Sequence, residues 1–186
     1  VVNSARLAAE ELPTLPVTVY DSGNLTLGTG FQVLAAAQAA ADGATMDEIL
    51  ALLQVQNGRT HTYAVLDTLE YLRRSGRLSR LQMHLGSLLQ LKPIITMNAG
   101  EPGLERVRTR KAAEARLLQM VEDLGPLEHL AVVHTHAPQR VPILQEMARP
   151  LFPSGQPSLV AEVTSVIGSH IGPGAAGFVA VQAPRA

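Results

Sequence analysis

Cysteine is absent from the 186 residues of this chain. Without thiols there is no disulfide framework and no thiolate metal site, and the composition fits a reducing compartment, so we expect a cytoplasmic protein. Tryptophan is also absent, and aromatic residues make up only 3% of the sequence. Stacking platforms for nucleobases or sugar rings are therefore not expected.

Neither charge nor hydrophobicity is extreme. The 15 basic and 16 acidic residues leave a net charge of −1, so nothing indicates nucleic acid or an anionic membrane as a partner. No apolar run reaches the roughly 18 residues of a membrane span, and the chain starts at Val1 without a signal-peptide pattern. Because 46% of the residues are hydrophobic, the chain can bury the core of one large domain or two small ones.

Helix-like and strand-like segments alternate along the chain, which predicts an α/β fold. Residues 1–59 suit the remaining half of a smaller βα layered N-terminal domain. Residues 60–186 hold enough strands for a C-terminal α/β sandwich domain with a mixed or largely antiparallel sheet. Strands are expected at about 15–20, 60–65, 91–97, 104–107, 127–134, 158–164 and 178–182, and helices at about 4–12, 31–41, 45–54, 66–76, 79–89, 111–124 and 142–149.

Four glycines and one proline fall within residues 168–177. Such a composition predicts a tight, rigid loop rather than a helix or a strand. Its titratable side chain is His170, and the flanking strands would hold it in place, which makes it a candidate binding residue. The alternative is a simple turn with an incidental surface histidine.

Arg77 is the second candidate. The leucine spacing predicts a short helix before it, and Gly76 is placed to end that helix in a left-handed C-cap. Arg77 would then be fixed between two helices, where an arginine binds either a structural carboxylate or carbonyl, or a ligand. The structural partner is the commoner outcome.

Of two weaker patterns, the first is a pair of glycines before a helix. Gly28-Thr29-Gly30 precedes a helix that should start near Phe31, and glycines before a helix N-terminus can bind anions. Their spacing matches neither the dinucleotide fingerprint nor the phosphate loop, so close packing explains them better.

Basic residues also concentrate at Arg106, Arg108, Arg110 and Lys111. They indicate either a solvated basic face or a docking patch for an acidic partner or a phosphate.

A metal site is not expected. His134 and His136 could share one face at a strand end, but zinc needs a third ligand. His129 lies five residues before His134 in the same strand, so its side chain would point to the opposite face.

Five blocks of sequence together resemble the bacterial DegV family, in the family's order and over nearly the whole chain. They are Asp21-Ser22 with Gly28–Phe31, Leu69–Leu72 through Gly76–Ser79, Leu88–Ile94, Arg108–Ala112, and His170–Gly174.

The resemblance implies a relative of the fatty-acid-binding subunits of bacterial fatty-acid kinase, which serve phospholipid metabolism. Such a subunit is not an enzyme itself: it holds one acyl chain in a tunnel between two α/β domains and presents the carboxylate to a separate kinase. It needs no cofactor besides the bound long-chain fatty acid. The residues carried over as fatty-acid ligands are His170, Arg77, Gly30, Phe31, Ile171 and Gly172, and the basic patch becomes the candidate for kinase docking.

Two departures from the family pattern accompany the resemblance. Ile171 stands where the family usually has a residue such as threonine. A Ser-Gly-Thr motif that helps bind the carboxylate would directly precede Asn3, so we expect this chain to match the C-terminal two-thirds of the family, without the first half of the N-terminal domain.

Two other function classes remain open. One is a hydrolase or acyltransferase with His170 as base and Ser79, Ser165 or Ser169 as nucleophile, although the sequence has no nucleophile elbow. The other is an interaction module without catalytic or lipid-binding activity.

Overall fold

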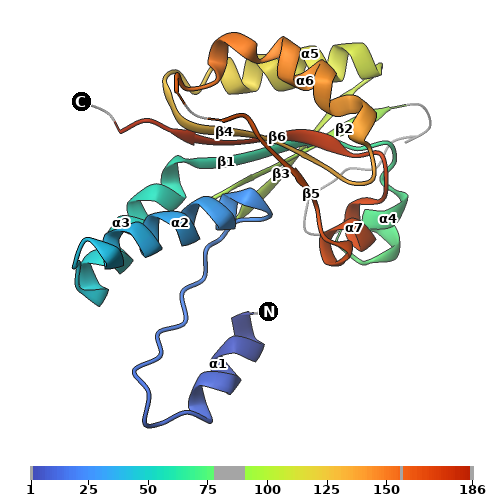
Figure 1. Cartoon of the computed structure of the whole chain (residues 1–186). Helices are drawn as coiled ribbons and strands as arrows, with labels where there is room; N and C mark the ends of the chain where they lie inside the picture. Colours follow the sequence, from blue (N-terminus) through green and yellow to red (C-terminus); the bar gives the residue numbers. More distant parts are fainter. Residues whose placement is uncertain (1, 78–90, 156, 185–186) are drawn as a thin grey trace.

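A six-stranded mixed sheet forms the centre of the computed structural model, which describes residues 2–77, 91–155 and 157–184 (Figure 1). The strand order is β3-β2-β1-β6-β4-β5, in which β4 and β5 pair in parallel and the other neighbours pair antiparallel. The α/β fold with a mixed sheet is thus confirmed. The strands are β1 Thr60–Val65, β2 Lys92–Asn98, β3 Glu101–Val107, β4 Leu127–His134, β5 Leu159–Glu162 and β6 Ala176–Gln182.

Helices cover both faces of this sheet. Figure 1 shows α5 and α6 on one face and α2, α3, α4 and α7 on the other. Short 3-10 turns flank α6 at Pro138–Arg140 and Arg149–Leu151. The helices are α1 Val2–Glu10, α2 Leu27–Ala41, α3 Met46–Arg59, α4 Glu70–Arg74, α5 Arg110–Glu122, α6 Val141–Met147 and α7 Ser165–Ile171.

Strand β6 explains why the sheet needs both helical layers. Successive strand side chains point to opposite faces, and nearly every residue of β6 is buried. Ala176, Phe178 and Ala180 pack in the core beneath α5 and α6. Val179 and Val181 face the other way, into a core that includes Phe31 of α2. A strand that is apolar on both faces therefore lies at the middle of the sheet.

Local sequence signals place the helices that precede β1. Thr45 and Glu48 form the expected capping box at the start of α3. Helix α2 begins at Leu27 rather than at Phe31. Helix α3 ends at Arg59, directly before β1, at the boundary that the sequence suggested, and the division into two domains stays a prediction.

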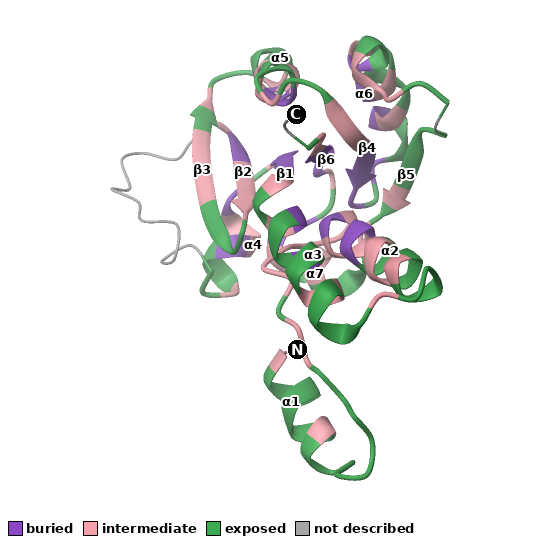
Figure 2. Ribbon diagram, turned by 90° about the vertical axis from the view of Figure 1, so that its left-hand side faces the viewer, coloured by how far each residue is buried: buried purple, intermediate pink, exposed green. Residues whose placement is uncertain are grey.

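Between α1 and residue 26, the chain differs from the expected structure. Residues 15–20 form no strand, and none of the strands in the described ranges pairs with them. Helix α1 has no buried residue and stands apart from the sheet (Figure 2). The helix expected at 79–89, with Ser79, lies outside the described residues.

None of the helices within the described ranges is long and apolar enough to cross a membrane. Helix α2 comes nearest in composition, since its 15 residues carry no charge. Its inner side packs on the sheet, whereas Val33 and Leu34 on its outer side are 61% and 62% exposed.

The glycine-rich stretch is only partly a loop. Residues 165–171 form the short helix α7, which contains both Gly168 and His170, so the prediction of a loop throughout was wrong there. The turn starts at Gly172, whose φ of 78° is left-handed. A Cβ atom on Gly172 would overlap the ring of Tyr71, so glycine is needed at this position for space as well as for conformation.

Candidate functional site

A cavity of about 480 Å³ lies between α7, the edge half of the sheet and the end of α4. Its size is within the usual range for small-molecule sites. Strands β1 and β2 form its floor, α7 and the segment before α2 form its walls, and Arg77 stands at its border. The lining residues are Leu25, Thr62, Leu72, Arg77, Ile95, Thr96, Met97, Gly100, Pro102, Ile167, His170 and Ile171.

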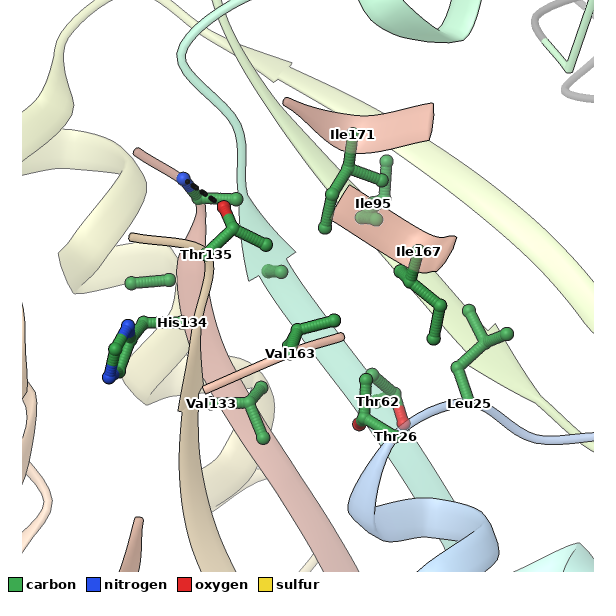
Figure 3. A pocket seen from close by; sticks show the side chains of 13 residues that line it. Leu25, Thr26, Thr62, Ile95, Val133, His134, Thr135, Val163, Ile167 and Ile171 are labelled. Atoms are coloured by element: carbon green, nitrogen blue, oxygen red, sulfur yellow. Dashed lines mark hydrogen bonds between the residues drawn. The ribbon is translucent and has the colours of Figure 1, made fainter. Parts of the chain in front are cut away.

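A second, narrower chamber of about 30 Å³ continues from the first. The two share part of their walls, namely Leu25, Thr62, Ile95, Ile167 and Ile171. Figure 3 shows aliphatic side chains of α7, β2 and the segment before α2 around this chamber, with the His134 ring turned away from them. The His134 ring instead accepts a hydrogen bond at Nδ1 from the Ala137 backbone N–H, at 3.3 Å. The chamber is thus an apolar extension of the larger cavity.

His170 lines the larger cavity from α7 and is half-buried. Its Nδ1 atom is buried and has no hydrogen-bond partner within the described part of the chain. A buried ring nitrogen without a partner costs free energy unless something binds it. His170 therefore brings to the cavity wall a ring whose Nδ1 atom has no hydrogen-bond partner among the described residues.

Arg77 reaches the same cavity from the other side. Gly76, with a φ of 69°, ends the preceding turn as the sequence predicted. The Arg77 side chain is exposed and donates from Nη1 to the Ser75 carbonyl at 2.8 Å. Among the described residues, this local bond uses one guanidinium nitrogen of three, so Arg77 keeps donors for an anion at the cavity border.

The neighbouring arginines are occupied on the surface. Arg73 and Arg74 both donate to Glu70 at 2.7 Å, and these bonds lower the pKa of the Glu70 carboxyl to about 2. Their role is to hold the last turn of α4, as expected of basic residues near a helix C-terminus.

Gly30 and Phe31 line neither chamber. The Phe31 ring is 2% exposed and stacks on His129, with ring centres 4.7 Å apart. It packs in the core behind Val133, which does line the narrow chamber. The lining residues from this part of the chain are instead Leu25 and Thr26.

A polar network holds Leu25 and Thr26 against the sheet. The Asn24 side chain donates to Asn57 Oδ1 at 2.8 Å, and the Gly100 N–H donates to the Gly23 carbonyl at 2.7 Å. The Asp21 carboxylate accepts from the Gly23 N–H at 3.1 Å, so the Asp21-Ser22 pair shapes this turn. Leu25 and Thr26 were not predicted, because the glycines beside them indicate only the start of a helix.

Thr62 and Ile167 were also missed, and only Ile167 left a signal. Ile167, His170 and Ile171 have the i, i+3, i+4 spacing of one helix face, and all three line the larger cavity. Thr62 lies on β1 opposite Met97 of β2, and this strand pairing places it at the cavity. The Thr62 and Thr26 hydroxyls are buried without a partner within the described residues.

The basic patch is partly neutralised. Arg110 forms an ion pair with Asp67, and Arg106 also has an interaction partner, whereas the Arg108 and Lys111 side chains are exposed. Thr109 caps α5 by accepting a hydrogen bond from the Ala112 N–H at 3.2 Å. The patch therefore surrounds the start of a capped helix.

The three histidines near β4 point to separate environments. His129 stacks on Phe31, His134 is buried, and His136 is exposed beyond the strand with a φ of 46°. Across the described ranges, no three histidine, cysteine or acidic residues gather where they could hold a metal ion.

Comparison with known proteins places these features in a family. A sequence model described as "Uncharacterised protein, DegV family" matches residues 1–183. A DegV domain-containing protein of Streptomyces coelicolor is 40% identical over 181 residues, which are 95% of this chain and 64% of that protein. The chain thus spans less than two-thirds of the length of this relative.

Solved structures resemble the whole chain. A DegV family protein from Thermus thermophilus, described for its fatty acid binding, has a TM-score of 0.84 and 32% identity, covering 98% of this chain and 66% of its own. DegV of Bacillus subtilis, described as a fatty acid binding protein, has a TM-score of 0.82 and 28% identity, with coverages of 98% and 66%.

Proposed function

The chain belongs to the DegV family, and we propose that it binds a long-chain fatty acid, with the alkyl chain in the two joined chambers and the carboxylate facing His170 and Arg77. The observation that carries the proposal is the continuous apolar cavity with His170 and Arg77 in its lining. Fatty-acid binding by the solved relatives from Thermus thermophilus and Bacillus subtilis supports it.

The chemistry of the lining suits such a ligand. An alkyl chain gains from the aliphatic walls, because each buried methylene contributes about 0.8 kcal/mol. A carboxylate needs hydrogen bonds or a cation where it leaves water. Arg77 supplies a cation, and the unpartnered Nδ1 atom of His170 can donate when it carries the proton.

The other carried-over residues take supporting places in this proposal. Ile171 contacts the alkyl chain, since its side chain lines both chambers. Gly172 forms the turn behind His170. Gly30 and Phe31 shape the outer layer of the narrow chamber rather than touching the ligand.

We further propose that the protein is not itself an enzyme and presents the carboxylate to a separate kinase in the cytoplasm. A carboxylate oxygen would attack the terminal phosphorus of a nucleoside triphosphate held by the kinase, giving an acyl phosphate and a nucleoside diphosphate. The kinase would dock on Arg106, Arg108, Arg110 and Lys111, of which Arg108 and Lys111 are most free to meet an acidic surface. No cofactor beyond the fatty acid is required.

Docking can be tested by reversing charge at Arg108 and Arg110. The Arg108→Glu, Arg110→Glu variant, loaded with palmitic acid, should give much less acyl phosphate with the kinase while it still binds palmitic acid. Unchanged acyl-phosphate formation would contradict docking on this patch and leave lipid binding unaffected.

A hydrolase finds less support. The Ser169 hydroxyl donates to the Val166 carbonyl at 2.8 Å and so faces its own helix rather than His170. Turnover of an activated ester, abolished by Ser169→Ala or Ser165→Ala, would favour a hydrolase.

The test of lipid binding is mass spectrometry of lipid extracted from the full-length gene product. We expect a long-chain fatty acid from the wild type. Ile167→Trp should abolish it by filling the cavity, whereas Val166→Trp, on the exposed side of the same helix, should keep it. A wild type that carries no lipid and takes up no palmitic acid would contradict the proposal and favour an interaction module.

A further inference from the structure

Helix α7, which carries His170, is too short to hold its own position. It has seven residues, and isolated helices of that length are not stable in water. Its N-terminal side is tied to the end of β4, where the Val163 N–H donates to the His134 carbonyl at 2.8 Å. Because one bond at the N-terminal side does not fix so short a helix, other groups must hold its C-terminal side.

Thr135 anchors that C-terminal side. It directly follows β4, is 5% exposed, and binds the turn after α7 with both its backbone and its side chain. The Thr135 hydroxyl donates to the Gly172 carbonyl at 2.6 Å and accepts from the Ala175 N–H at 3.0 Å. The Thr135 N–H donates to the Ala175 carbonyl at 2.9 Å, and the Gly174 N–H donates to the Thr135 carbonyl at 2.7 Å.

Arg140 holds the same turn from the opposite direction. Its Nη1 atom donates to the Gly174 carbonyl at 2.8 Å, and its Nη2 atom donates to Glu114 of α5, also at 2.8 Å. The Arg140 and Glu114 side chains are only 6% and 14% exposed, so this ion pair lies inside the protein. Arg140 lines neither chamber, so it acts on the site only through the turn, whereas Thr135 also lines the narrow chamber.

The turn needs these bonds because its own backbone is permissive. Gly172 and Gly174 have φ angles of 78° and 83°, which glycine adopts among many others. Apolar packing of Ile167 and Ile171 on the leucines around α4 holds α7 near the cavity. Such packing is not directional, so hydrogen bonds to the turn carbonyls are needed to fix the rotation of the helix.

We propose that Thr135 and Arg140 are positioning residues that set where the His170 ring stands over the cavity. The inference rests on the proposed fatty-acid function because it takes its ligand from that function. The geometry of the turn does not depend on it. Thr135 fixes the turn from the end of β4, and the Arg140–Glu114 pair links it to α5. His170 then needs no further rearrangement to meet a carboxylate.

The test compares variants that remove these bonds without leaving an unpaired buried charge. Arg140→Met combined with Glu114→Gln removes the bond to Gly174, and Thr135→Val removes the hydroxyl while Thr135→Ser keeps it. The matched control is Arg149→Met with Glu146→Gln, which makes the same exchanges in an exposed ion pair. Palmitic acid is the probe, and the ring signals of His170 are followed by NMR in the ligand-free protein.

We expect the affinity for palmitic acid to fall on the order of tenfold in the Arg140 double variant and in Thr135→Val, as for the loss of a buried hydrogen bond. The His170 ring signals should shift or broaden in both. Thr135→Ser and the surface double variant should match the wild type. If either inner variant fails to fold, the other carries the comparison.

Two results separate this inference from the proposed function. Unchanged affinity and unchanged His170 signals in a folded Arg140 double variant would overturn the positioning role. A wild type that does not bind palmitic acid would overturn the proposed function, and the His170 signals would still decide the positioning role.

Discussion

Gly172 should be among the least replaceable residues near the site. Alanine there meets two obstacles: the φ of 78° disfavours a side chain, and the new Cβ atom would overlap the Tyr71 ring. Gly76 offers a comparison, because its φ of 69° is also positive but nothing lies within 4 Å of an added Cβ atom. Removing the Tyr71 ring then separates crowding from backbone strain at Gly172.

The expected costs follow from these differences. Gly76→Ala should lose only the strain energy, about 1–2 kcal/mol of unfolding free energy. Gly172 also has a ψ of 170°, and essentially only glycine combines this ψ with a positive φ, so Gly172→Ala should lose about 1–3 kcal/mol to backbone strain. Overpacking should cost about 1–3 kcal/mol more. Tyr71→Ala removes the ring, so in that background the Gly172→Ala cost should fall to the strain alone, about 1–3 kcal/mol. Urea unfolding followed by circular dichroism measures the wild type, the three single variants and the Tyr71→Ala, Gly172→Ala double variant.

The reasoning would be refuted if Gly172→Ala were no more destabilising than Gly76→Ala. It would also be refuted if the Tyr71→Ala background gave no relief, because the crowding would then not come from that ring. Either result would mean that the turn after α7 has room to move, and His170 would not be held as described.

Three further predictions concern the sheet and its helical cover. Burial raises the pKa of Tyr63 to about 12, so its contribution to stability is full below pH 10 and is lost as the pH rises through 12. Between pH 9 and pH 11, the unfolding free energy from urea denaturation should fall by about 1 kcal/mol more in the wild type than in Tyr63→Phe. Burial lowers the pKa of His61, which disfavours its charged form in the fold; stability should therefore fall as the pH drops below 6.5, and a flatter acid limb is expected for His61→Gln. Phe31→Ala should cost about 3–5 kcal/mol in thermal or urea unfolding because the ring is buried, whereas Leu34→Ala, on the exposed side of the same helix, should change stability by less than about 0.5 kcal/mol.

Most of the sheet could be predicted because its signals are local. The apolar runs of β4 and β6 are visible in the sequence, and both strands occur close to where they are expected. Residues 15–20 have similar β-branched character but form no strand, since a strand also needs a partner to pair with. Pairing is a tertiary property that the local pattern does not contain.

Part of the site could also be predicted from local signals in the sequence. His170, Arg77 and Ile171, which the resemblance implied as ligand residues, lie around one cavity, and their contact with a ligand stays a prediction. The glycine count around His170 outweighed the helical spacing of Ile167, His170 and Ile171, and so α7 was missed. Phe31 was placed at the tunnel, but its stacking on His129 depends on how α2 lies on β4. Thr135 and Arg140 gave no sequence signal at all, because their role lies in contacts with residues more than thirty positions away.

The central claim is that an acyl chain occupies the cavity beside α7 with its carboxylate at His170. A crystal structure of the full-length gene product with palmitic acid tests it most directly. We expect an alkyl chain between Ile95 and Ile167, with a carboxylate oxygen within hydrogen-bond distance of the His170 ring and close to Arg77. An empty cavity, or a chain bound with its methyl end toward His170, would contradict it.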